Sequence, residues 1–286
     1  MKPAGAPVVF ALVSTQIQTC YRHGDRRAGV VCQRCDRPIC PDCMRQASVG
    51  FHCPECTKSG AQKVVRPRDL VTRAIVTQVL IAINVAVALL GMSMQSDELV
   101  FQGGLVANGF LDGELVGVAN GEWYRIVTSG FLHSGLLHLG FNMFVLYQLG
   151  QLLEPALGRL RFGIVYFVAM LSGSLGVMIV SPDNLTVGAS GAVFGLMGAA
   201  VAALRQRGID VMSTGLGGTI VLNLVITFTL SQYISVGGHV GGLIGGFLAG
   251  WILVDLGPRF LKDPSLVLGA VVAMGVVVGG SALLIA

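Results

Sequence analysis

The chain has 286 residues, of which 53% are hydrophobic and only 12% are charged. Soluble domains carry about 25% charged residues, so this composition excludes an ordinary water-soluble globular protein. The 40 glycines accompany long apolar runs rather than Pro and Ser, which excludes a low-complexity disordered chain and favours closely packed transmembrane helices. The net charge of +4 is too small and too scattered to indicate nucleic-acid binding.

The sequence begins with a segment, residues 1–19, whose only apolar patch is Val8–Val13. This patch is too short for a secretory signal, so we expect a disordered extension. A cysteine-rich head over residues 20–57 and a basic linker over residues 58–70 follow. The remainder is a membrane domain, divided into residues 71–256 and a C-terminal part over residues 257–286.

The head holds all seven cysteines of the chain, arranged with one histidine in four pairs. Each pair has two intervening residues, which lets a tight turn direct both side chains at one tetrahedral ion. The pairs are Cys20/His23, Cys32/Cys35, Cys40/Cys43 and Cys53/Cys56. They predict two structural zinc sites with four protein ligands each. The segment is too short for a hydrophobic core of its own, so metal binding would supply much of its folding free energy.

Alternatives to this zinc arrangement remain open. Disulfides are disfavoured in a reducing cytoplasm, and redox chemistry of the Cys-x-x-Cys pairs is the second interpretation. Cross-bracing, in which the first pair joins the third and the second joins the fourth, resembles B-box and RING-like fingers and is preferred to sequential pairing. His52 is an alternative ligand to Cys53, although the Cys53–Cys56 turn is the better chelate.

Seven apolar stretches follow, each near the roughly 20 residues needed to cross a bilayer. They cover approximately 71–92, 131–150, 161–180, 187–204, 216–234, 237–256 and 265–286. The sequence therefore predicts an all-α polytopic membrane protein.

Basic residues mark every second connection between these spans. They are Arg66, Arg68, Arg73, Arg159, Arg161, Arg205, Arg207, Arg259 and Lys262. The alternate connections are acidic or neutral, apart from Arg125 in the first long loop. The positive-inside rule then predicts a plasma-membrane protein with a cytoplasmic N-terminus and an extracellular C-terminus.

Polar residues inside spans are costly and suggest function. His138 and Asn142 lie four residues apart and share one helical face in the second span. The alternative is a hydrogen-bonding pair between helices. His133 lies nearer the interface and is interpreted as a hydrated bystander, and Glu154 near the inner end as a structural residue.

Ser190 opens the fourth span between small residues, where free backbone amides can bind an anion. Serine in a glycine-rich membrane helix more often simply packs, so this motif alone is weak. Gly191, Gly195 and Ala199 give the same helix a face of small side chains.

The sixth span carries His239 between two interleaved Gly-x-x-x-Gly ladders, which allow close approach of a neighbouring backbone. The ladders are Gly237/Gly241/Gly245 and Gly238/Gly242/Gly246. If one ladder packs on the small face of the fourth span, His239 comes beside Ser190, the arrangement of a serine activated by a histidine base.

Together these residues resemble the rhomboid family of intramembrane serine proteases. The resemblance covers about residues 70–256 and rests on four ordered motifs: Tyr124-Arg125, His138-x3-Asn142, Gly188-Ala-Ser190-Gly191, and His239 with Gly241 and Gly242. It implies a six-helix rhomboid-like bundle with one extra C-terminal helix. The zinc-ribbon or B-box-like head and the seventh span resemble a bacterial, actinobacterial-type subgroup.

The resemblance also implies roles for individual residues. Ser190 would be the nucleophile and His239 its base, with His138, Asn142 and the Ser190 amide forming the oxyanion hole. Phe194, Gly191 and Gly241 would pack around the dyad, and Phe194 stands where the family commonly has Tyr. Arg125 would order the outer loop. The substrates would be transmembrane helices of other membrane proteins. The role of the cytoplasmic head stays open between binding a protein partner, sensing redox state and tethering.

Three other functions fit the sequence less well. A zinc intramembrane protease would need metal ligands in the spans, and no His-Glu-x-x-His occurs in the sequence. A catalytically inactive relative that binds transmembrane helices usually lacks the serine or the histidine, and this sequence has both. A transporter would show an inverted repeat, and none is evident.

Overall fold

The computed structural model describes residues 18–60, 73–93, 97–111, 113–261 and 263–286. The chain divides into two compact units, Met1–Val71 and Thr72–Ala286. The expected disordered extension and basic linker lie almost entirely outside the described residues.

The N-terminal unit contains two short antiparallel hairpins. β1 (Val30–Val31) pairs with β2 (Pro38–Ile39), and β3 (Arg45–Gln46) pairs with β4 (Phe51–His52). A 3-10 turn at Pro41–Cys43 and the short helix α1 (Pro54–Ser59) complete it. Its small core is dominated by cysteines with Ile39, and so few apolar side chains cannot stabilise a fold alone.

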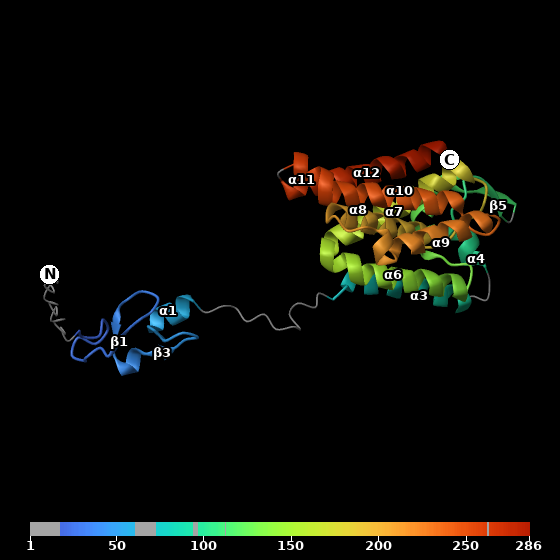
Figure 1. Ribbon diagram of the computed structural model, residues 1–286. Coiled ribbons are helices and arrows are strands. Elements are labelled where there is room, and N and C mark those ends of the chain that lie inside the picture. The colour runs from blue at the N-terminus through green and yellow to red at the C-terminus, as the bar shows by residue number, and fades with distance from the viewer. Residues whose placement is uncertain (1–17, 61–72, 94–96, 112, 262) are drawn as a thin grey trace, which may run out of the picture. The chain divides into compact units, whose positions relative to one another are not determined.

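The second unit is a helical bundle. Its long helices are α3 (Ile75–Ser93), α6 (Leu136–Leu157), α7 (Arg159–Val180), α8 (Ser190–Gln206), α9 (Leu216–Thr229), α10 (Val236–Trp251) and α12 (Pro264–Ile285). A π-helical segment, Ile252–Leu256, and the short helix α11 (Gly257–Phe260) continue α10. α7 and α8 lie between α3 and α6 on one side and α10 and α12 on the other (Figure 1).

Among the described residues, five helices are long and apolar enough to cross a membrane: α3, α6, α7, the continuous helix Val236–Phe260, and α12. α8 has 17 residues and α9 has 14, fewer than a full perpendicular crossing requires. Each predicted span corresponds to a helix, but several boundaries were wrong. Residues 131–135, expected in the second span, precede α6, and α9 ends at Thr229 rather than near residue 234.

The core forms around α8, because its small side chains let four neighbouring helices approach. Every residue of α8 from Ala192 to Ala200 is buried. α10 packs against both α8 and α7, and α12 packs along α7, where Gly275 faces Val168. The extra C-terminal helix is therefore an integral part of the bundle.

The connection between α3 and α6 folds as a compact loop. It contains α4 (Glu98–Gly103), a hairpin of β5 (Gly109–Leu111) and β6 (Glu114–Val116), and α5 (Arg125–Thr128). Leu105 and Thr186 exchange two backbone hydrogen bonds of 2.8 Å. This pairing fixes the loop to the segment that leads into α8.

Glu154 has the structural role expected from the sequence. It is 2% exposed and accepts hydrogen bonds from the backbone N–H groups of Val76 (2.9 Å) and Thr77 (2.8 Å) and from the Thr77 hydroxyl (2.7 Å). The carboxylate therefore satisfies amides in the first turn of α3 that have no partner within that helix.

Candidate active site and metal centres

Ser190 is the first residue of α8 and is partly exposed. Gly188, two residues earlier, has φ +130° and donates its N–H to Ser129 O over 2.9 Å. That left-handed backbone favours glycine, and a Cβ here would also lie 2.7 Å from the His138 ring and 3.6 Å from Ser190 Oγ. The missing side chain leaves the space between His138 and Ser190 open.

The two glycine ladders of α10 face different helices. Cβ atoms at Gly242 and Gly246 would strike the carbonyl oxygens of Gly191 and Gly195 on α8. Cβ atoms at Gly237 and Gly241 would strike the carbonyl oxygens of Gly176 and Ser172 on α7. The small faces of α8 and α10 therefore meet as expected from the sequence. The expected dyad contact of Gly241 is wrong, because Gly241 faces α7 and Gly242 lies opposite Gly191.

His239 lies in the first turn of α10 and is 8% exposed. Its ring stacks on Phe194, one helical turn after Ser190, with centroids 4.0 Å apart and an interplanar angle of 20°. Ser235 caps α10 by accepting from Gly238 N over 3.1 Å. The stacking and the glycine contacts together place the imidazole at the Ser190 end of α8.

α6 contributes the polar residues on the other side of Ser190. Asn142 is 6% exposed and donates one amide hydrogen to His138 O over 2.9 Å, which leaves its second N–H available. His138 Nδ1 lies 3.2 Å from Ser134 Oγ. His133 meets the His138 ring edge-on, with centroids 5.1 Å apart, and neither of its buried ring nitrogens has a protein partner.

A cavity of about 410 Å³ lies beside His133. It is bounded by α3, α4 and the start of α6, and its polar lining includes Asp97, His133 and Ser134. His133 therefore borders a space large enough for water, although both of its ring nitrogens are buried.

Arg125 is buried in the compact loop between α3 and α6, where it is 1% exposed. Its Nε pairs with Glu122 over 2.7 Å, and its Nη1 donates to the carbonyls of Phe101 and Gly104, each at 2.7 Å. Gly104 directly precedes Leu105, whose backbone pairs with Thr186. Arg125 thus holds together the part of the loop that supports the approach to Ser190.

The ion pair with Arg125 keeps the Glu122 carboxylate in its charged form. Burial alone would raise its pKa, but hydrogen bonds from Arg125, Gly117 N and Tyr124, together with the Arg125 charge, hold the pKa below its usual value. Burial and the Glu122 carboxylate raise the pKa of Tyr124. Arg125 therefore departs from the positive-inside pattern because its charge is neutralised within the loop.

Three residues near the site were not predicted from the sequence. Ser134 contacts His138, Ser235 caps the helix that carries His239, and Thr227 Oγ1 lies 2.7 Å from His239 Nδ1. Thr227 is on α9, twelve residues before its partner, and the only local sign was a hydroxyl within an apolar stretch. Helical periodicity does not reveal contacts between helices.

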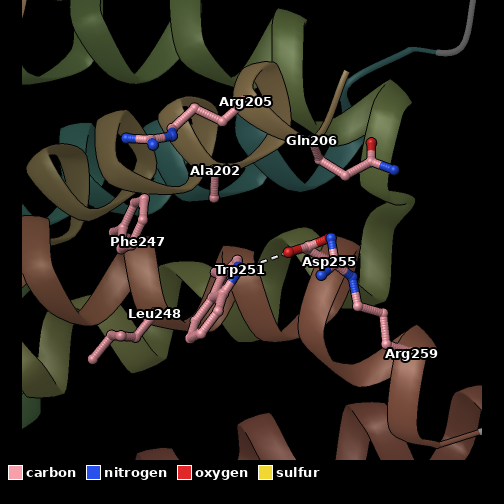
Figure 2. A pocket seen from close by; sticks show the side chains of 8 residues that line it. All are labelled: Ala202, Arg205, Gln206, Phe247, Leu248, Trp251, Asp255 and Arg259. Carbon is pink, nitrogen blue, oxygen red and sulfur yellow. Dashed lines mark hydrogen bonds and ion pairs between the residues drawn. The ribbon is translucent and has the colours of Figure 1, made fainter. Parts of the chain in front are cut away.

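A second cavity, of about 470 Å³, lies at the opposite end of α8 (Figure 2). Its lining includes Arg205, Phe247 and Trp251; Trp251 donates to Asp255 over 2.9 Å, and Asp255 pairs with Arg259 over 2.6 Å. The cavity contains neither Ser190 nor His239. It is therefore separate from the candidate active site.

The head forms two separate ligand tetrads. One combines Cys20, His23, Cys40 and Cys43, and the other combines Cys32, Cys35, Cys53 and Cys56. This is the cross-braced pairing, so sequential pairing is wrong, and His52 belongs to neither tetrad. The seven cysteines are free thiols.

The spacing within each tetrad fits a tetrahedral ion. Zn–S bonds of about 2.3 Å and Zn–N bonds of about 2.0–2.1 Å require S–S and S–N separations near 3.8 and 3.6 Å. Cys35 and Cys53 Sγ are 3.8 Å apart, and His23 Nδ1 lies 3.3, 3.5 and 3.8 Å from the sulfurs of Cys40, Cys43 and Cys20. The tetrads can therefore hold metal ions without rearrangement.

Charge within a tetrad also favours a cation. Burial and the neighbouring Cys20 and Cys40 raise the pKa of Cys43 to about 11. In Cys20, burial is outweighed by hydrogen bonds, including those from the backbone of Arg22, Cys40 and His23, which lower the pKa to about 6. The thiols thus oppose one another's ionisation, and a bound divalent cation would remove that repulsion.

Comparison with known proteins identifies the bundle. Residues 120–256 match the family model of the Rhomboid domain, a range that includes Arg125, Asn142, Ser190 and His239. This chain therefore contains a Rhomboid domain, and several of its helices are long and apolar enough for a membrane protein.

Several curated proteins are similar over parts of the chain. YdcA of Bacillus subtilis is 45% identical over 84 residues, which cover 29% of this chain and 42% of YdcA. Rhomboid protease GluP of the same species is 37% identical over 138 residues, covering 47% of this chain and 26% of GluP. Inactive RHOMBOID-like protein 8 of Arabidopsis thaliana is 38% identical over 88 residues, covering 31% and 25%. The matched segments span less than half of each relative, and the relatives include a protein named as inactive.

Proposed function

We propose that this protein is an intramembrane serine endopeptidase that hydrolyses peptide bonds in or near transmembrane helices of other membrane proteins. The observation that carries the proposal is the interlocking of the glycines of α8 and α10, with His239 stacked on Phe194 one turn after Ser190. A nucleophile and a base on separate helices need such a close backbone approach to meet. Packing alone would not need a histidine at this position.

In this mechanism Ser190 Oγ attacks the carbonyl carbon of the scissile bond while its proton passes to His239 Nε2. The tetrahedral intermediate collapses, the C–N bond breaks, and the proton moves from His239 to the leaving amine. Water then repeats the sequence on the acyl-enzyme, releasing the acid and restoring Ser190.

The developing oxyanion would be bound at the start of α8. The Ser190 N–H, the second amide hydrogen of Asn142 and His138 Nε2 are the proposed donors. If the Ser134 hydroxyl donates to His138 Nδ1, the ring proton lies on Nε2, facing the space that Gly188 leaves open. Each donor placed at the oxyanion lowers the barrier by about 3–4 kcal/mol.

The substrate must unwind locally, because helical amides are paired and are costly to expose in lipid. Helices with Gly, Ala, Ser or Pro near their outer ends are the preferred class. The cavity beside His133 gives water a polar space next to the site.

We further propose that the protein lies in the plasma membrane with its head cytoplasmic, its C-terminus extracellular and two structural zinc ions in the head. The tetrad spacing supports zinc, and alternating Arg-rich connections support the orientation. Metal analysis of reduced protein should give about two zinc ions per chain. Because Cys56 is the last cysteine, an Ala286→Cys variant should react with impermeant maleimide on intact cells, and failure to do so would reject the orientation.

The catalytic proposal is tested by incubating the purified full chain with a single-span substrate. Ser190→Ala and His239→Ala should abolish cleavage, whereas Ser181→Ala, which removes a hydroxyl from the preceding loop, should leave it unchanged. A fluorophosphonate should label Ser190 in wild type and not in His239→Ala. Cleavage that persists in Ser190→Ala refutes the assignment, and substrate binding without cleavage by the wild type would indicate a non-catalytic member.

A further inference from the structure

Thr227 is a polar residue of α9 whose position the dyad alone does not explain. It is 1% exposed, whereas other residues of this helix, including Val225, Ile226 and Phe228, present exposed apolar side chains. Its Oγ1 lies 2.7 Å from His239 Nδ1. α9 therefore directs one hydroxyl inward, at hydrogen-bonding distance from the proposed base.

The proton in this contact can be assigned from the second partner of Thr227. A threonine hydroxyl has one hydrogen, and Thr227 Oγ1 also lies 2.7 Å from Asn223 O, a carbonyl that can only accept. With the hydroxyl hydrogen directed at Asn223 O, Oγ1 presents a lone pair to His239. In this arrangement Nδ1 of His239 carries the ring proton, which leaves Nε2 unprotonated.

We propose that Thr227 is a positioning residue that fixes the tautomer and orientation of His239. The inference rests on the proposed function, because it concerns the base of that reaction. The Phe194 ring restrains the plane of the imidazole, and Thr227 restrains its rotation within that plane. A neutral hydroxyl relayed to the Asn223 carbonyl thus performs the orienting task that a carboxylate performs in Ser-His-Asp triads.

The contact also strengthens as the reaction proceeds. When His239 takes the serine proton it becomes a cation, and the hydrogen bond from Nδ1–H to Thr227 Oγ1 becomes charge-assisted. Hydrogen bonds to charged groups stabilise more than neutral ones, so losing this acceptor should slow catalysis by roughly 10- to 100-fold. Because the contact is made with Nδ1 and not with the Nε2 that takes the serine proton, KM should stay within about twofold.

The test compares three variants of the full chain in the substrate assay. Thr227→Val keeps the shape and removes the acceptor, so kcat and the fluorophosphonate labelling rate of Ser190 should fall together. Thr227→Ser keeps the hydroxyl and should restore kcat to within about threefold of wild type. Thr219→Val is the matched control, because Thr219 is exposed on the same helix and its hydroxyl bonds only Gly215 O, four residues back, at 3.0 Å; its kcat should be unchanged.

A second measurement reads the tautomer in the wild-type protein, and a variant is needed only to assign the signals. In protein labelled with 15N-histidine, observed at a pH where His239 is neutral and assigned by its loss in His239→Gln, Nδ1 should give the protonated shift and Nε2 the unprotonated one. The opposite tautomer overturns the inference, as does wild-type kcat in Thr227→Val, or a loss that Thr227→Ser fails to restore. Cleavage that depends on Ser190 but not on Thr227 refutes this inference alone, whereas cleavage independent of Ser190 refutes the proposed function.

Discussion

A single methyl group at Gly242 should separate the two helices that carry the dyad. The Cβ of Gly242→Ala would lie 2.7 Å from Gly191 C and 3.0 Å from Gly191 Cα, and would strike Gly191 O. These are backbone atoms, so no rotamer change relieves the contact. Because few Cβ atoms approach closer than 3.4 Å, α10 must withdraw from α8 by at least about 0.7 Å.

The displacement has two measurable costs. Overpacking a close interface destabilises by about 1–3 kcal/mol, and misplacing reacting groups by about 1 Å costs roughly 10²-fold in rate. Gly242→Ala should therefore lower both the midpoint of SDS-induced unfolding and kcat for a single-span substrate. The matched control is Gly269→Ala on α12, where a Cβ meets nothing within 4 Å and both quantities should stay at wild type. Wild-type stability and kcat in Gly242→Ala would refute the argument that close helix approach assembles the site.

Three other predictions concern the loop and the head. Arg125→Met leaves the Phe101 and Gly104 carbonyls without their guanidinium donor and Glu122 without its cation, so it should destabilise by about 3–5 kcal/mol and make the loop susceptible to limited proteolysis; an unchanged digestion pattern would contradict this. Because the folded pKa of Glu122 is depressed, its contribution to stability is present above its unfolded pKa of about 4.3 and is lost as pH falls through the folded value. Melting temperatures between pH 3 and 6 should show this loss in wild type and a smaller one in Glu122→Gln; identical profiles would exclude it. Cys20→Ser should reduce bound zinc from about two ions to one, because the tetrads share no ligand, and chelation should remove both ions and the far-UV signal of the head; retention of two ions would disprove the assignment.

Much of the membrane domain could be predicted because its signals are local. Apolar runs gave seven helices in the right order, and His138 and Asn142 share a face because both lie on one helix. The predicted helix boundaries were wrong where tertiary contacts determine the residue at which a helix begins or ends. The second helix begins at Leu136 because the preceding residues form the 3-10 turn Ser129–Phe131 and an extended connection, and Ser129 O accepts from Gly188.

The sequence alone determined the residue types and their spacing: four two-residue ligand pairs, a serine at a helix start, and two glycine ladders around a histidine. Spacing restricts only neighbours along one element. Which ligand pairs share an ion, which ladder meets α8, and whether a hydroxyl reaches His239 depend on backbones far apart in sequence. Those contacts were decided by tertiary packing, since one ladder fits the carbonyls of α8 and the other those of α7, and Thr227 of α9 reaches the imidazole in the packed bundle.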